Sequence, residues 1–177
     1  SNYLKLLIVA RFSKEKGYEL LFKALSNLNC KFKLKCIGEG CTYENPYFNK
    51  LCLKYSIEPQ ALETTKNLSK IYGDNDFLIV PSYSESSPNV IVEAILEGTP
   101  SIITPTGVYT SLLKKFNLVS NSFNSNDLTE VLKKGFLLKS DPIKYEAVRR
   151  ELLKKIKLYI STPSEAAKEY EKLFLNN

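Results

Sequence analysis

The sequence predicts a doubly wound, Rossmann-like α/β domain, in which a parallel sheet carries helices on both faces. Two observations predict this class. Short apolar segments of strand length alternate with segments whose apolar residues recur at helical spacing, and short loops join them. The strand-like segments are also apolar on both faces, as in a parallel sheet that helices cover on each side.

The expected elements follow one another along the chain with few ambiguities. Residues 4–10 (LKLLIVA) form a buried strand, and residues 17–28 carry a helical stripe of leucine and alanine. Residues 56–65 show no regular pattern. The other expected elements are strand 32–37, helix 46–55, helix 67–72, strand 77–81, helix 89–97, strand 101–104, helix 110–116, short strand 118–119 and three further helices.

The domain is expected to occupy residues 1–160, followed by a closing helix within residues 161–177. Residues 161–163 break the last long helix, and Ser164 can cap the closing one. No methionine occurs, even at position 1, so we expect the chain to be an excised piece of a longer protein.

Composition excludes several kinds of chemistry. An apolar fraction of 44% and a charged fraction of 25% suit an ordinary globular domain, and no apolar run is long enough to span a bilayer. The absence of histidine excludes Ser-His-Asp and Cys-His catalysis and a histidine base. The four cysteines contain no Cys-x-x-Cys pair, so we expect reduced thiols and no metal site.

The net charge of +6 favours an anionic partner. The basic residues are spread along helical patterns, including residues 114–115, 133–134 and 149–157. Solvated helix faces are the first interpretation of this spread, and attraction to an anionic membrane surface is the alternative.

Two glutamates, Glu85 and Glu93, form the strongest candidate site. Glu85 lies in the loop that leaves strand 77–81, and Glu93 lies about one turn into the next helix. Ligands of doubly wound sheets bind outside the carboxyl ends of the strands, where both residues fall. A carboxylate in an otherwise apolar helix is costly unless it is hydrogen-bonded, and sugar hydroxyls would satisfy it. The alternative is that Asn89, Glu93 and Glu97 form a polar stripe facing solvent.

Two further features could bind an anion. The amides of Ser87, Asn89 and Val90 lie near the positive end of the helix dipole and could bind a phosphate. The alternative is an ordinary capped helix start. Arg11 and Lys16 follow the first strand and could clamp a diphosphate, unless they are solvated loop residues.

Several segments together resemble the C-terminal, donor-binding domain of retaining glycosyltransferases of family four, which have the GT-B fold. The resemblance covers nearly the whole chain. The matching segments are 10–21 (ARFSKEKGYELL), 36–40 (CIGEG), 71–72 (IY), 76–82 (DFLIVPS), the two-glutamate motif 85–93, 98–100 (GTP) and 166–170 (AAKEY). The chain departs from the family at residues 56–65, where the strand before the base-binding loop is not recognisable. It departs again at 105–107 (PTG), where members of the family often have paired glycines followed by an acidic residue.

The resemblance implies a role for each candidate residue. Arg11 and Lys16 would bind the donor diphosphate and stabilise it as it leaves, in place of a metal ion. Glu93 would hold the ribose hydroxyls, and Glu85 would face the transferred sugar. The amides at the helix start would cradle phosphate and sugar, and residues 62–67 would border the nucleobase. No metal ion or other cofactor is implied.

The implied enzyme is a hexosyltransferase that moves a sugar from a nucleotide sugar, with a UDP-sugar favoured, to a glycan or lipid-linked acceptor with retention. It would serve bacterial cell-surface polysaccharide biosynthesis. The enzyme would be cytoplasmic and could bind peripherally at the inner face of the cytoplasmic membrane, and it would have no nucleic acid partner. The acceptor would bind an N-terminal domain that this chain lacks, so the chain alone should bind nucleotide and transfer nothing. The alternatives are another GT-B enzyme, such as a sugar-nucleotide epimerase, and a non-catalytic basic module that binds nucleotide or membrane.

Overall fold

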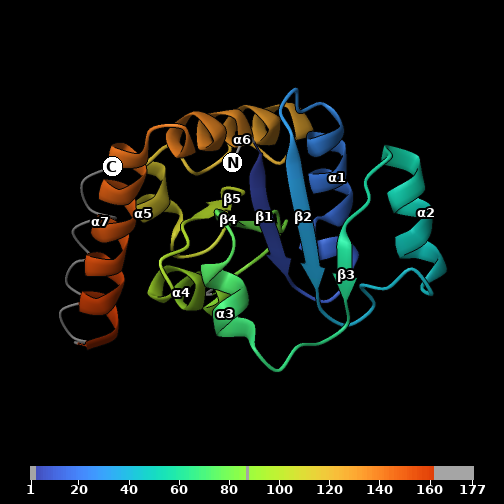
Figure 1. The fold of residues 1–177 in the computed structure, drawn as a ribbon, viewed down its shortest axis with the longest axis horizontal. Helices are drawn as coiled ribbons and strands as arrows, with labels where there is room; N and C mark the ends of the chain where they lie inside the picture. Colours follow the sequence, from blue (N-terminus) through green and yellow to red (C-terminus); the bar gives the residue numbers. More distant parts are fainter. Residues whose placement is uncertain (1–2, 87, 162–177) are drawn as a thin grey trace.

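The computed structural model describes residues 3–86 and 88–161, and within them it contains one five-stranded sheet (Figure 1). The strand order is β3-β2-β1-β4-β5, and all four strand pairs are parallel. The strands are β1 (Leu4–Val9), β2 (Phe32–Ile37), β3 (Gln60–Leu62), β4 (Phe77–Val80) and β5 (Ser101–Ile103). The doubly wound class predicted from the sequence is confirmed.

The helices lie within two residues of the segments expected from the apolar periodicity. A short 3-10 helix, η1 (Lys14–Lys16), precedes the first of them. The α-helices are α1 (Tyr18–Ser26), α2 (Pro46–Tyr55), α3 (Leu68–Gly73), α4 (Asn89–Leu96), α5 (Thr110–Lys114), α6 (Ser125–Lys139) and α7 (Pro142–Ser161). The expected closing helix lies outside the described residues.

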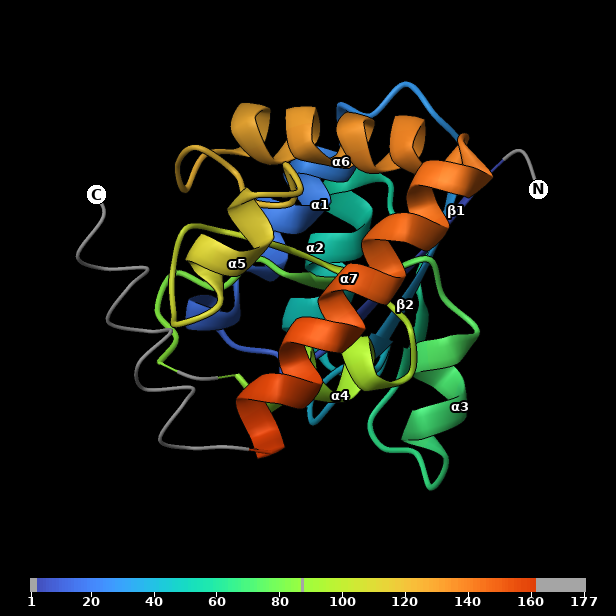
Figure 2. The same cartoon turned by 90° about the vertical axis from the view of Figure 1, so that its left-hand side faces the viewer.

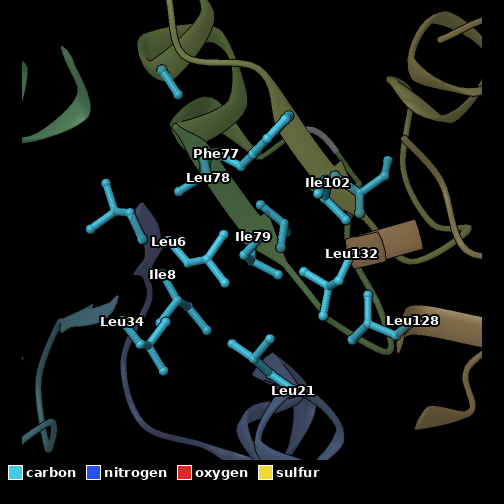
Figure 3. Packing of buried hydrophobic residues seen from close by; sticks show 14 of the residues in the cluster. Leu6, Ile8, Leu21, Leu34, Phe77, Leu78, Ile79, Ile102, Leu128 and Leu132 are labelled. Carbon is cyan, nitrogen blue, oxygen red and sulfur yellow. The ribbon is translucent and has the colours of Figure 1, made fainter. Parts of the chain in front are cut away.

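Helices cover both faces of the sheet. On one face, Leu21 of α1 and Leu132 of α6 point toward Ile79 of β4 (Figure 3). On the other face α4 packs against α3 and α7, and Figure 2 shows α7 and α4 in front of α1 and α2. β4 is buried along its whole length because it lies between these two layers.

The strand order reverses between β1 and β4. From β1 the chain moves outward to β2 and β3, and it then returns to place β4 and β5 on the other side of β1. At such a switch point the loops that leave the two central strands diverge to opposite faces, which opens a crevice at the carboxyl edge. The fold therefore places the loops after Val9 and Val80 on the two sides of one crevice.

A close backbone approach joins these two loops. Gly17 has φ +70°, and a Cβ atom built on it would lie 1.9 Å from the carbonyl oxygen of Pro81. The amide of Tyr83 also donates a 2.9 Å hydrogen bond to the carbonyl of Glu15. Only glycine combines this left-handed conformation with so short a distance. The loop after β1 is thus fixed to the loop after β4.

The sheet differs from the expectation in two places. β3 was not expected within residues 56–65, because three residues without a β-branched or aromatic side chain leave no pattern to detect. The expectation that the strands are apolar on both faces is wrong for the start of β1 and β2. Lys33 is exposed and Lys5, its neighbour in register, is half-buried. The reason is that α3 packs on α4 and leaves this part of the face open.

Gly17→Ala should lower the free energy of unfolding by at least about 2 kcal/mol, since it adds both left-handed strain and a clash with Pro81. Urea unfolding followed by circular dichroism measures this change. The control is Gly73→Ala, where the nearest atom to the added Cβ lies at 3.8 Å. That substitution should change stability by no more than about 1 kcal/mol. Equal effects of the two substitutions would contradict the account.

Candidate functional site

A pocket of about 160 Å³ lies at the switch point between β1 and β4. The carboxyl ends of the two strands, the loops that follow them and the start of α4 all contribute to its lining. The lining residues are Ile8, Val9, Ala10, Lys16, Ile79, Val80, Pro81, Ser82, Glu85, Pro88, Asn89 and Val90. The fold thus brings four of the predicted site residues, Lys16, Glu85, Asn89 and Val90, around one pocket.

An ion pair crosses the pocket. The Nζ atom of Lys16 lies 2.6 Å from Oε1 of Glu85, and the two side chains are only 23% and 14% exposed. The hydroxyl of Ser82 donates to the same oxygen at 2.8 Å. Burial strengthens such a pair because less water screens it. The positive charge of Lys16 is therefore balanced within the protein.

The loop after β5 holds Glu85 in place. The amide of Glu85 donates to Oγ1 of Thr106 at 3.1 Å, and the amide of Val108 donates to the carbonyl of Ser86 at 3.0 Å. The buried hydroxyl of Thr104 donates to the carbonyl of Ser82. Sequence reasoning missed these three supports. Residues 105–107 were noted only as a departure from the family pattern, and no spacing rule links them to Glu85.

The start of α4 faces the pocket with its positive end. The helix begins after Pro88, which provides no capping side chain, and its first turn contains no acidic residue. Asn89 and Val90 in that turn line the pocket. The first amides of a helix and its dipole favour an anion. The third predicted amide, that of Ser87, lies outside the described residues.

Glu93 lies outside the pocket lining, one turn further along α4. Its side chain is exposed, and its Oε2 accepts a 2.8 Å hydrogen bond from the hydroxyl of Tyr72 on α3. Glu97, also exposed, accepts a bond from Ser69 at 2.7 Å.

The apolar sequence around Glu93 predicts a buried helix, and this prediction is wrong, because α4 buries only one side, through Ile91, Ala94 and Ile95. The alternative interpretation, a polar stripe at i, i+4 spacing, agrees with the exposure of Asn89, Glu93 and Glu97. Exposure leaves Glu93 accessible to a ligand.

Arg11 pairs with a neighbouring glutamate and not with a residue of the pocket. Its guanidinium lies 2.6 Å from Oε1 of Glu15, its side chain is 64% exposed, and it does not line the pocket. This ion pair holds the pKa of the Glu15 carboxyl below its usual value. The diphosphate-binding role expected for Arg11 stays a prediction.

The remaining composition-based expectations concern thiols and membranes. All four cysteines are free thiols, and burial raises the pKa of each. Over residues 3–86 and 88–161, no helix has the length and apolar character needed to cross a membrane.

The chain belongs to the family described as glycosyl transferases group 1, whose sequence profile matches residues 1–157. Among curated relatives, an uncharacterised glycosyltransferase of Methanocaldococcus jannaschii, MJ1178, is 28% identical over 173 residues and 95% of this chain. Glycogen synthase of Alkaliphilus metalliredigens is 25% identical over 94% of this chain. The chain spans 43% and 37% of the lengths of these two relatives.

Solved structures of low sequence identity share the fold. The catalytic domain of cholesterol-α-glucosyltransferase from Helicobacter pylori has a TM-score of 0.75 at 21% identity, covering 88% of this chain and 98% of that one. HepE of Anabaena in complex with UDP has a TM-score of 0.75 at 16% identity, covering 97% of this chain and 49% of that one. WaaG, a glycosyltransferase involved in lipopolysaccharide biosynthesis, has a TM-score of 0.72 at 21% identity, and the match covers 89% of this chain and 43% of WaaG. The architecture is that of a GT-B C-terminal domain.

A double-mutant cycle of Lys16→Met and Glu85→Gln should give a coupling energy of about 1–2 kcal/mol in the free energy of unfolding, because the pair is partly buried. The control pair is Lys54 and Glu19, which has the same 2.6 Å separation but side chains that are 56% and 60% exposed. Its coupling should stay below about 0.5 kcal/mol. A coupling at Lys16 and Glu85 no larger than in the control would contradict the described site.

Proposed function

We propose that this chain binds a nucleotide sugar, with a UDP-sugar favoured, as the donor-binding part of a retaining hexosyltransferase. The observation that carries the proposal is the pocket at the switch point, where Lys16, Glu85 and the start of α4 meet. Membership of the glycosyl transferases group 1 family supports sugar transfer as the reaction. Complexes of the structurally similar HepE with UDP and with UDP-glucose support the choice of donor.

The donor diphosphate would lie between Lys16 and the first turn of α4. Its negative charges would compete with Glu85 for the Lys16 ammonium, and the amides of Asn89 and Val90 would add donors from the other side. Fixed positive charge at these two places would stabilise the leaving diphosphate without a metal ion. Arg11 would join this site by leaving Glu15.

The ribose would lie at Glu93 and the base near residues 62–67. Glu93 lies one turn beyond Asn89 on the side of α4 that faces α3, and residues 63–67 connect β3 to α3. A nucleoside diphosphate that runs from the pocket toward α3 would meet these elements in the order phosphate, ribose, base.

Glu85 would act on the transferred sugar. Once the diphosphate shares Lys16, the Glu85 carboxylate can accept hydrogen bonds from sugar hydroxyls close to the reacting carbon. Ser82 would hold this carboxylate, and Thr106 the backbone of Glu85, in position through the exchange. Glu85 is therefore the residue proposed to act in catalysis.

We further propose that the acceptor is a glycan or a lipid-linked sugar, and that the reaction serves cell-surface polysaccharide synthesis at the inner face of the cytoplasmic membrane. The similarity to WaaG supports this assignment. The matched relatives are more than twice as long as the segment they share with this chain. We therefore propose that transfer also needs residues outside this chain, and that the chain alone binds nucleotide without turnover.

Calorimetric titration should detect binding of UDP, with a dissociation constant between about 10 μM and about 1 mM, unchanged by EDTA. Lys16→Met should weaken UDP binding about 10-fold, because it removes a charge-assisted contact to the diphosphate. Glu93→Gln should weaken it about 3- to 10-fold through the ribose.

Two matched variants serve as controls in this titration. Lys54→Met removes an exposed lysine that also pairs with a glutamate, and Glu97→Gln changes the next glutamate along α4. Neither should change UDP affinity by more than about 2-fold. If UDP, GDP and ADP all fail to bind at millimolar concentration, the proposal fails and a non-catalytic basic module becomes the better explanation.

A further inference from the structure

The hydroxyl of Tyr72 reaches from the interior to an exposed carboxylate. Tyr72 is 1% exposed, yet its hydroxyl donates a 2.8 Å hydrogen bond to Oε2 of Glu93, whose side chain lies at the surface. An exposed glutamate without such a partner samples many rotamers, and fixing it costs conformational entropy when a ligand binds. The bond to Tyr72 restricts this freedom before any ligand arrives.

The tyrosine is well suited to act as a permanent donor. Burial raises the pKa of the Tyr72 phenol far above its usual value, and the neighbouring Glu93 carboxylate raises it further. The hydroxyl therefore stays protonated at any physiological pH. Its bond to Glu93 uses one carboxylate oxygen and leaves the other available as an acceptor for a ligand.

The position of Tyr72 is itself fixed by the fold. Its carbonyl accepts a 2.6 Å hydrogen bond from Oγ1 of Thr99, which is 1% exposed. α3 and α4 are also joined by a second, outer hydrogen bond from Ser69 to Glu97 at 2.7 Å. The two bonds have the same chemistry, but only the inner one has a buried donor and a carboxylate one turn from the pocket.

We propose that Tyr72 is the positioning residue for the ribose-binding carboxylate. It holds Glu93 in the rotamer that accepts the ribose hydroxyls of a nucleoside diphosphate. The inference rests on the proposed function and adds a residue that touches no ligand itself. It also gives α3 a role. This helix follows the expected base-binding segment, and through Tyr72 it orients the Glu93 carboxylate that binds the ribose.

The test compares two ligands on the full chain, UDP and 2′-deoxy-UDP, by calorimetry. The unsubstituted chain should bind UDP about 10-fold more tightly than 2′-deoxy-UDP, because the deoxy ligand leaves Glu93 without one hydroxyl partner. Tyr72→Phe keeps the buried ring and removes only the hydroxyl. It should weaken UDP binding about 3- to 10-fold and 2′-deoxy-UDP binding less than about 2-fold, so that the preference for ribose shrinks.

Two control variants separate positioning from general loss of structure. Tyr145→Phe removes another buried hydroxyl, whose 2.6 Å bond to the carbonyl of Asp76 lies at the opposite edge of the sheet. It should lower the melting temperature and leave the ribose preference unchanged. Ser69→Ala removes the outer bond between α3 and α4, and it should also leave the preference unchanged.

The outcomes distinguish the inference from the function on which it rests. If the unsubstituted chain binds neither ligand, the proposed function fails and the inference fails with it. If that chain prefers UDP but Tyr72→Phe weakens both ligands equally, or changes neither, only the role of Tyr72 is overturned. A ribose preference that shrinks in Tyr72→Phe and persists in both controls supports the inference.

Discussion

The close contact between Gly17 and the carbonyl of Pro81 is the constraint on which the site depends. Parallel pairing of β1 with β4 brings the ends of the two strands together, but it does not by itself bring the loops into contact. The missing side chain at Gly17 allows the backbone of one loop to pack on the other. Lys16, the preceding residue, is then held opposite Glu85. Gly17 thus allows the two neighbouring loops to pack closely enough for the ion pair between Lys16 and Glu85 to form.

The charged groups of the site have partners within the protein. Lys16 is paired with Glu85, Arg11 with Glu15, and Glu93 is held by Tyr72. These arrangements differ in whether a bound ligand would replace an internal partner or add to it. At Lys16 and Arg11 the proposed diphosphate would have to replace an internal carboxylate, which would cost part of the binding energy. At Glu93 the proposed ligand would add a partner to a carboxylate that already accepts a hydrogen bond from Tyr72. Under the proposed function, phosphate would therefore exchange places with carboxylates at Lys16 and Arg11, whereas a sugar hydroxyl would meet a Glu93 carboxylate that is already positioned.

Much of the fold could be predicted from the sequence because it depends on local periodicity. The leucine stripe of α1 and the apolar run of β4 identify buried elements without knowledge of their neighbours. β3 could not be predicted, since its pairing with β2 comes from sheet geometry and not from its own three residues. The Lys33 side of β2 was misjudged for a similar reason: which part of a sheet face a helix covers depends on where α3 packs.

The site was predictable to the extent that its residues follow strands. Lys16 and Glu85 follow β1 and β4, so the rule for the carboxyl ends of parallel strands places them together. Tyr72 and Thr106 escaped prediction because they come from α3 and from the loop after β5, and nothing in their own sequence context indicates which side chain they meet. Contacts between elements distant in the chain require the assembled structure.

The proposed function requires that the pocket between β1 and β4 bind the diphosphate of a nucleotide. A crystal structure of the chain soaked with UDP tests it most directly. We expect diphosphate oxygens within hydrogen-bond distance of Lys16 Nζ and the first amides of α4, with a ribose hydroxyl on Glu93. UDP bound elsewhere on the chain, with Lys16 still paired to Glu85 and the pocket unoccupied, would contradict it.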